Sequence, residues 1–169
     1  MIHLILGGAR SGKSRRALAL VKGKPRVYFF ATAEPMDAEM RTRIAAHRRE
    51  RPAGWTTVEE SRRVAERLMR LPARSIVILD CLTLWVARLI SDRAGLDRIL
   101  AAVDAIGRAV RTRRLTLVVV SNEVGSGVVP PTRLGRVFQD ALGAANARLA
   151  NRADRVELMV AGLPLTVKG

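Results

Sequence analysis

The chain has few aromatic residues, a single cysteine and no long uncharged hydrophobic run. Two Trp, one Tyr and three Phe make up 4% of its 169 residues, too few for a surface on which nucleic-acid bases stack. The longest apolar stretches, near residues 76–90 and 115–120, are interrupted by charged and polar residues. We therefore expect no membrane-spanning segment and no membrane insertion.

Cys81, the lone cysteine, has no partner for an internal disulfide, which fits a reducing compartment. The amino terminus leads directly into a glycine-rich loop and leaves no room for a cleavable signal. Both observations predict a cytoplasmic protein. A chain of this length with 49% hydrophobic residues is expected to form a single domain, residues 1–169.

Acidic residues are scarce relative to basic ones, at 15 against 30, so the formal net charge is +15. A basic surface is typical of nucleic-acid binding. However, only four of the basic residues are lysines, and the arginines are spread over predicted helices instead of forming one patch. We expect anionic small substrates and no nucleic acid as partner.

The amino-terminal stretch MIHLILGGARSGKSRRALAL predicts a phosphate-binding loop. Gly7, Gly12, Lys13 and Ser14 fill the pattern G-x-x-x-x-G-K-[ST] between an apolar strand and a helix-prone run. Glycines let backbone N–H groups surround a polyphosphate, and the helix amino terminus adds its positive dipole. Lys13 is expected to contact the β- and γ-phosphates, and the Ser14 hydroxyl to bind Mg²⁺. The alternative is a glycine turn with a solvated lysine, but the strand–loop–helix context favours a nucleoside triphosphate.

Short apolar runs alternate with helical patterns, which predicts an α/β fold with a mostly parallel sheet covered on both faces. The predicted strands are residues 2–6, 26–31, 75–79, 115–120 and 156–161. The tail LMVAGLPLTVKG reads as a strand, a Gly162–Pro164 turn and a returning edge strand. Helices are expected at residues 15–21, 35–49, 61–71 and 133–151, with two more across 82–113. The prediction is a three-layer P-loop NTPase with a C-terminal edge hairpin.

Polar residues follow three of the predicted strands, at the sheet edge where ligands bind in parallel sheets. Asp80 closes the run SIVILD, which is where a Walker-B acid lies beside the P-loop metal. It is alternatively the N-cap of the next helix, and the two roles are compatible. Cys81 is interpreted as a packing residue. The other polar strand ends are Thr32, Ala33 and Glu34, and Ser121, Asn122 and Glu123.

The stretch EMRTRIAAHRRERPAGWTTVEE contains one of the two histidines. Met36, Met40 and Ile44 form an apolar helical stripe, and His47 flanks it near the helix end. In the structural alternative, His47 caps the carboxyl terminus of the helix, where a cation is favoured. A catalytic role is suggested by the arginines that follow, because positive charge lowers an imidazole pKa and favours the neutral, nucleophilic ring.

Three further residues complete this set of hypotheses. Glu59 and Glu60 follow Trp55, and their carboxylates could accept from the N1–H and amino group of guanine; a solvated acidic pair is the alternative. His3, inside the first strand, is interpreted as a core residue.

Taken together, these motifs resemble the bifunctional adenosylcobinamide kinase/adenosylcobinamide-phosphate guanylyltransferase family of cobalamin biosynthesis. The resemblance extends from Leu4 to Lys168. The P-loop alone is generic, whereas H-R-x-x-R-P-x-x-W-x-T-x-E followed by N-E-V-G-x-G-x-V-P is specific. The segments that carry it are GGARSGKS, FATAEPMDAEMRTRIAAHRRERPAGWTTVEE, ILDCLTLWV, VSNEVGSGVVP and VAGLPLTVK.

The resemblance implies two reactions on one scaffold. In the first, the γ-phosphoryl group of ATP or GTP moves to the aminopropanol hydroxyl of adenosylcobinamide. In the second, GTP guanylylates a histidine, His47 by its place in the motif, and the cobinamide phosphate takes the GMP to give adenosylcobinamide-GDP. The resemblance also implies a RecA-like fold and a homo-oligomer, commonly a trimer.

By position in the family motifs, Lys13 and His47 are the expected catalytic residues, and Ser14 and Asp80 the expected Mg²⁺ ligands. Two alternatives remain: a small-molecule P-loop kinase in which His47 is structural, and a RecA-like nucleic-acid ATPase. The expected nucleotide contacts are Gly7, Gly8, Ala9, Arg10, Ser11, Gly12, Lys13, Ser14, Thr32, Ala33, Glu34, Arg48, Arg49, Glu50, Arg51, Glu59 and Asp80.

Overall fold

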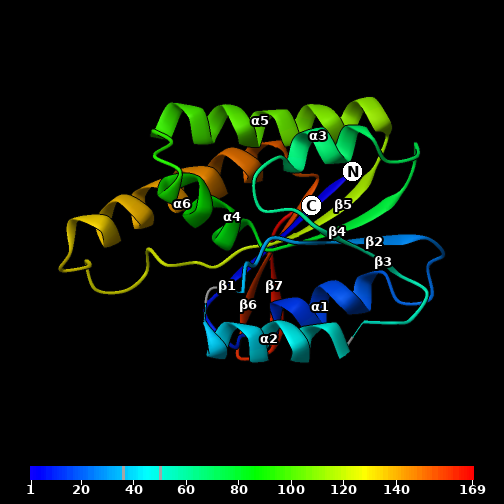
Figure 1. The fold of residues 1–169 in the computed structure, drawn as a ribbon, viewed down its shortest axis with the longest axis horizontal. Coiled ribbons are helices and arrows are strands. Elements are labelled where there is room, and N and C mark those ends of the chain that lie inside the picture. Colours follow the sequence, from blue (N-terminus) through cyan, green and yellow to red (C-terminus); the bar gives the residue numbers. More distant parts are fainter. Residues whose placement is uncertain (36, 50) are drawn as a thin grey trace.

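The computed structural model describes residues 1–35, 37–49 and 51–169, with the side chains of Arg43 and His47 outside that description. Within it, strands and helices follow one another along the chain (Figure 1). In order they are β1 (Ile2–Gly7), α1 (Lys13–Leu20), β2 (Val27–Ala31), α2 (Ala38–Arg49), β3 (Thr56–Glu59), α3 (Val64–Met69), β4 (Ile76–Asp80), α4 (Leu82–Ser91), α5 (Leu96–Arg113), β5 (Thr116–Val120), α6 (Arg133–Arg152), β6 (Arg155–Val160) and β7 (Leu163–Lys168).

The strands form one seven-stranded sheet in the order β3-β2-β4-β5-β1-β6-β7. Neighbouring strands are parallel except β6 and β7, which are antiparallel. Helices α1 and α2 lie on one side of the sheet, and α3, α4, α5 and α6 lie on the other (Figure 1). The predicted three-layer α/β fold with a mostly parallel sheet and a C-terminal hairpin is confirmed.

The central strands β1, β2, β4 and β5 are buried on both faces, which explains why they read as continuous apolar runs. Leu4 and Leu79 point toward the helices α3–α6, whereas Ile5 and Ile78 pack on the α1 side, and all four are fully buried. None of the helices in the described ranges is long and apolar enough to cross a bilayer.

The predicted helix bounds were too wide in two places. Helix α2 begins at Ala38 and not at Pro35, because the Asp37 carboxylate accepts a hydrogen bond from the Met40 backbone N–H at 2.7 Å, and so closes the first turn. Helix α3 begins at Val64 and not at residue 61, because the Glu60 carboxylate holds the preceding turn outside the helix.

Strand β3 was not predicted. Its sequence, TTVE, has one apolar residue, and only that residue is half-buried because β3 is the edge strand beside β2. A four-residue edge strand without an apolar run gives no periodic signal in the sequence. The strand nevertheless matters, because it brings Glu59 to the sheet edge level with Ala31.

A buried ion cluster joins α1 to the sheet. The Glu157 carboxylate on β6 is fully buried and accepts hydrogen bonds from Arg16 Nε and Nη2, each at 2.8 Å, and from Arg155 Nε at 3.1 Å. His3 Nε2 lies 3.4 Å from the same carboxylate. The hydrogen bonds from Arg16 hold the pKa of Glu157 below its ordinary value, and burial lowers the pKa of His3. His3 is a core residue, as predicted.

These shifts predict that the free energy of unfolding falls as the pH is lowered. The unfolded chain binds a proton at His3 near its ordinary pKa of 6.5, while the folded chain resists protonation until a lower pH. Stability is therefore lost from about pH 6.5 downward, and Glu157 adds a further loss below its own ordinary pKa of 4.5. Denaturant titrations between about pH 5 and 8 should show a steeper loss in the wild type than in His3→Gln. Parallel curves would contradict the assignment to His3.

Candidate active site

The loop between β1 and α1 has the backbone of a phosphate-binding loop. Gly7 has φ +151°, and a Cβ there would lie 2.7 Å from the Met159 carbonyl oxygen, so no larger residue fits. Gly12 has φ +92° and is the N-cap of α1 without a side-chain cap. The first backbone N–H groups of α1 are thus available to an anion, as the sequence pattern requires.

Lys13, the first residue of α1, is folded over this loop. Its side chain is buried, and Nζ donates a hydrogen bond to the Gly8 carbonyl at 2.5 Å. Burial lowers the pKa of Lys13, while nearby Cys81 and Asp80 oppose that shift. A buried ammonium held by a loop carbonyl and close to a carboxylate is ready to exchange those partners for phosphate oxygens.

A cleft of about 710 Å³ opens at the carboxyl ends of the strands, within the size range of small-ligand sites. The phosphate loop forms one wall, α2 contributes Met40, Ile44 and Ala46, and the ends of β2, β3 and β4 form the floor. The part of the predicted apolar stripe that falls on Met36 lies outside the described residues. The predicted residues that line the cleft are Ala9, Arg10, Ser11, Gly12, Lys13, Ser14, Ala33, Arg51, Glu59 and Asp80.

Asp80 is the last residue of β4 and lines the cleft with Lys13 and Arg51. Its charge acts on the pKa values of both Lys13 and Arg51. The N-cap of α4 is Cys81 instead of Asp80, with the Leu84 backbone N–H donating to Sγ at 3.5 Å. Burial, reinforced by Asp80, raises the pKa of Cys81 to about 11, so this thiol stays protonated near neutrality.

Ser14 and Asp80, on two sides of the cleft, are the residues that fit a Mg²⁺ site. Groups of three or more His, Cys, Asp or Glu side chains able to hold a metal are absent from the part of the chain that the structure describes. A donor set of one hydroxyl and one carboxylate suits Mg²⁺, which binds through few protein oxygens together with substrate phosphates and water.

Arg51 lies flat against the floor of the cleft. Its guanidinium carbon is 3.8 Å from the centroid of the Phe29 ring, and Nη1 donates to Thr57 Oγ1 at 3.2 Å. Burial lowers the pKa of Arg51. Its Nε is buried without a hydrogen-bond partner in the described structure. Stacking on Phe29 fixes the guanidinium plane before any anion arrives.

The other predicted residues around α2 fall into three groups. Arg48 is exposed and forms an ion pair with Glu59, which lines the cleft. Arg49 is exposed and outside the cleft lining. His47 is in α2 by its backbone, but its side chain and all of Glu50 lie outside the described structure.

Thr32 and Glu34 do not line the cleft. Thr32 is buried, and its hydroxyl both donates to the Cys81 carbonyl and accepts from the Cys81 N–H, at 2.8 Å each. Glu34 points toward α4, where it meets Arg62 and Arg88. Glu60, the candidate guanine acceptor beside Glu59, instead accepts hydrogen bonds from the Arg62 and Arg63 backbone N–H groups at 2.9 and 2.8 Å.

Phe29 and Asn122 are among the cleft residues that were missing from the predicted site. Phe29 is an ordinary apolar strand residue, so nothing in the sequence marks it as the platform under Arg51. Asn122 follows β5 and lines the cleft, with its backbone N–H donating to Thr83 Oγ1 at 2.7 Å. The predicted position of Asn122 just after a strand was the signal in the sequence that could have identified it as a site residue.

The family model for cobinamide kinase/cobinamide phosphate guanyltransferase matches residues 3–167. The chain belongs to this family. Three bifunctional adenosylcobalamin biosynthesis proteins are similar to it over their whole length. CobP of Pseudomonas aeruginosa is 43% identical over 100% of this chain and 98% of its own. CobU of Escherichia coli and CobU of Salmonella typhimurium are each 37% identical over 99% of this chain and 100% of their own.

Solved structures of lower identity share the fold of this cobinamide kinase/guanyltransferase family member. A protein from Pyrococcus horikoshii OT3 superposes with a TM-score of 0.58 at 10% identity, covering 99% of this chain and 86% of the other. The RadB recombinase superposes with a TM-score of 0.52 at 20% identity, covering 93% and 73%. The RecA-like part of the predicted fold is confirmed by this likeness, which shows the fold alone.

Proposed function

We propose that this chain phosphorylates adenosylcobinamide with ATP or GTP, and then transfers GMP from GTP through His47 to the resulting adenosylcobinamide phosphate. The observation that carries the proposal is the convergence on one cleft of the phosphate loop, Asp80 and α2, the helix in which His47 lies. The family to which the chain belongs, and the names of its relatives, give the substrates.

In the kinase step, the aminopropanol hydroxyl attacks the γ-phosphorus and the bond to the β–γ bridging oxygen breaks, while the hydroxyl loses its proton. Lys13 and the N–H groups of the loop stabilise the charge that develops on the phosphates. Ser14 and Asp80 would hold Mg²⁺, whose contribution is to shield the phosphate oxygens. The nucleoside diphosphate leaves from the loop.

In the guanylyl step, an imidazole nitrogen of His47 attacks the α-phosphorus of GTP and pyrophosphate leaves. A phosphoramidate forms, which is reactive enough to pass GMP to a weak phosphate nucleophile. An oxygen of adenosylcobinamide phosphate then attacks the same phosphorus, and the phosphorus–nitrogen bond breaks to return the free histidine. Arg51, held on Phe29, is placed to stabilise charge at this end of the cleft.

The proposal extends to the setting of the reaction. We propose Mg²⁺ as the cofactor, a cytoplasmic location, and a homo-oligomer such as a trimer. Thr32, Arg48, Arg49 and Glu50 remain predicted nucleotide contacts, whereas Glu34, bonded to Arg62 and Arg88 outside the cleft, does not. No nucleic-acid partner is proposed.

The proposed function is tested by intact mass spectrometry after incubation with GTP and Mg²⁺, with an alkaline quench that preserves a phosphoramidate. We expect a covalent GMP adduct that disappears when adenosylcobinamide phosphate is added. A protein that phosphorylates adenosylcobinamide yet never carries GMP would be a small-molecule kinase and would refute the covalent route.

A further inference from the structure

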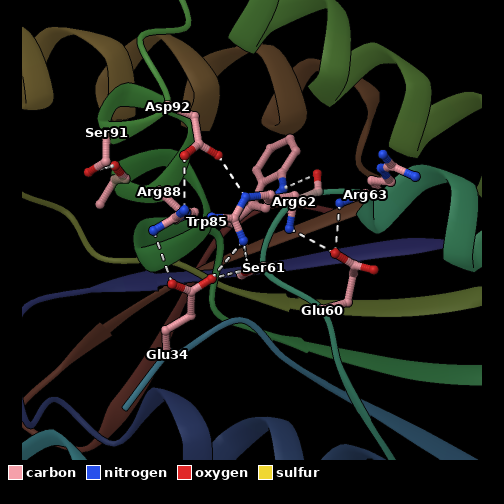
Figure 2. Close-up of polar contacts among 10 residues, drawn as sticks. Glu34, Glu60, Ser61, Arg62, Arg63, Trp85, Arg88, Ser91 and Asp92 are labelled. Atoms are coloured by element: carbon pink, nitrogen blue, oxygen red, sulfur yellow. Dashed lines mark hydrogen bonds and ion pairs between the residues drawn. The ribbon is translucent and has the colours of Figure 1, made fainter. Parts of the chain in front are cut away.

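Four charged side chains outside the cleft form a closed ring, here called the clasp: Glu34, Arg62, Asp92 and Arg88 (Figure 2). Arg62 Nη1 lies 3.0 Å from Glu34 Oε1, and Arg62 Nε lies 2.8 Å from Asp92 Oδ2. Arg88 Nη1 lies 3.1 Å from Glu34 Oε2, and Arg88 Nη2 lies 3.0 Å from Asp92 Oδ1. Each acid thus binds both arginines, and the charges of the ring balance.

Neighbouring hydrogen bonds fix the chain that passes through the clasp. Ser61 Oγ donates to Glu34 Oε1 at 2.5 Å. The buried indole of Trp85 on α4 donates from Nε1 to the Arg62 carbonyl at 3.1 Å. Figure 2 shows these groups together with Glu60, which holds the turn before α3. An exposed ion pair alone contributes little, but here side chains and backbone are bound in one network.

The clasp closes the base of one long excursion of the chain. Glu34 follows β2, and Ser61 and Arg62 follow β3, so the two ends of residues 35–60 are bonded to each other and to α4. This excursion contains α2 with His47, and it supplies Arg51 and Glu59 to the cleft. Strand β3 is fixed beside β2 in the sheet, and the clasp adds the contacts that tie both ends of the excursion to α4, so the position of α2 at the cleft depends on both.

The phosphate loop is held by different contacts. Lys13 bonds to Gly8, and α1 is bonded to the sheet through Arg16 and Glu157. No side chain of the clasp is among the residues that line the described cleft. Loss of the clasp should therefore displace α2 while it leaves the loop in place.

We propose that the clasp is a positioning device for guanylyl transfer, which sets where α2 presents His47 to the α-phosphate of GTP. The inference rests on the proposed function. It assigns Glu34 to holding the excursion, and it makes Arg88 and Asp92 positioning residues although neither contacts the cleft. The kinase step, which needs the phosphate loop, is independent of the clasp.

The test is the ratio of two rates in Arg88→Met, a change that removes half of the ring contacts. At saturating GTP, formation of the GMP adduct should slow about tenfold or more, because small displacements of a reacting group have large effects on rate. Phosphorylation of adenosylcobinamide should stay within about twofold of the wild type. Arg88→Lys should recover part of the guanylylation rate, because it retains the positive charge.

The matched control is Arg152→Met, which breaks a similarly half-buried arginine contact with Asp104 at 2.9 and 2.6 Å, away from the cleft. It should leave the ratio unchanged. Equal loss of both rates in Arg88→Met, or adduct formation at the wild-type rate, would overturn the clasp. If Arg88→Met does not fold, Asp92→Asn removes the charge that binds both arginines of the ring, and an unchanged ratio there overturns the clasp.

Different outcomes would refute the proposed function and the clasp. A wild type that forms no GMP adduct would refute the covalent mechanism, and this inference with it. A wild type that forms the adduct, with an unaltered ratio in the clasp variants, would refute the clasp alone.

Discussion

Replacing Lys13 with alanine is expected to abolish both reactions, each falling by about 10²–10³-fold or more. Lys13 is buried at the start of α1, bonded to the Gly8 carbonyl and close to Asp80, so its ammonium is placed to bind the phosphates of a nucleotide held by the loop. Both reactions require a nucleoside triphosphate in that loop. The measurements are the rate of adenosylcobinamide phosphorylation and the rate of GMP adduct formation.

Lys22→Ala is the matched control, because Lys22 is an exposed lysine just beyond the other end of α1. Its removal changes the net charge equally and should leave both rates near those of the wild type. If Lys13→Ala retains either activity, two separate nucleotide sites exist and the single-cleft mechanism is wrong.

The sequence was sufficient to predict most of the fold because the fold depends on strong local signals. Continuous apolar strands, a glycine loop and amphipathic helices gave the parallel sheet and its two covering layers. The C-terminal hairpin was predicted with its turn at Gly162–Pro164. The turn lies instead at Ala161 and Gly162, which take positive φ values of 50° and 86°, and Pro164 belongs to β7. Edge strand β3 was missed because an exposed four-residue strand needs little apolar content.

The candidate site was predictable where function depends on a contiguous motif. The phosphate loop and Asp80 were placed correctly in the cleft because a strand end determines where the next residues point. Arg51 was predicted only through the family motif, and its support on Phe29 depends on packing between segments that are distant in sequence.

Contacts between distant charges were not predictable. Glu157 reads as one polar residue in an apolar strand, and its burial with Arg16 depends on how α1 crosses the sheet. The clasp joins residues 34, 62, 88 and 92, and each looks like an ordinary surface charge in a chain with 30 basic residues. Charge pairing of this kind has no periodic signature.

Replacing His47 with alanine is expected to slow formation of the GMP adduct by about 10³-fold or more while a large part of the kinase activity remains. The nucleophile is indispensable to a covalent route, since no phosphoramidate forms without an imidazole nitrogen. Transfer of the γ-phosphoryl group needs the loop, Lys13 and the metal ligands, none of which is altered. The measurement is intact mass after incubation with GTP and Mg²⁺, alongside the phosphorylation rate.

His3→Gln is the internal control, because His3 is the other histidine of the sequence and lies in the core, bonded to no cleft residue. The adduct should persist in that variant and be absent from His47→Ala, which assigns the phosphoramidate to one ring. Equal loss of adduct and kinase activity in His47→Ala would instead indicate that His47 supports folding or nucleotide binding. An adduct that survives in His47→Ala would place the nucleophile elsewhere, and the positioning role of the clasp would lose its basis.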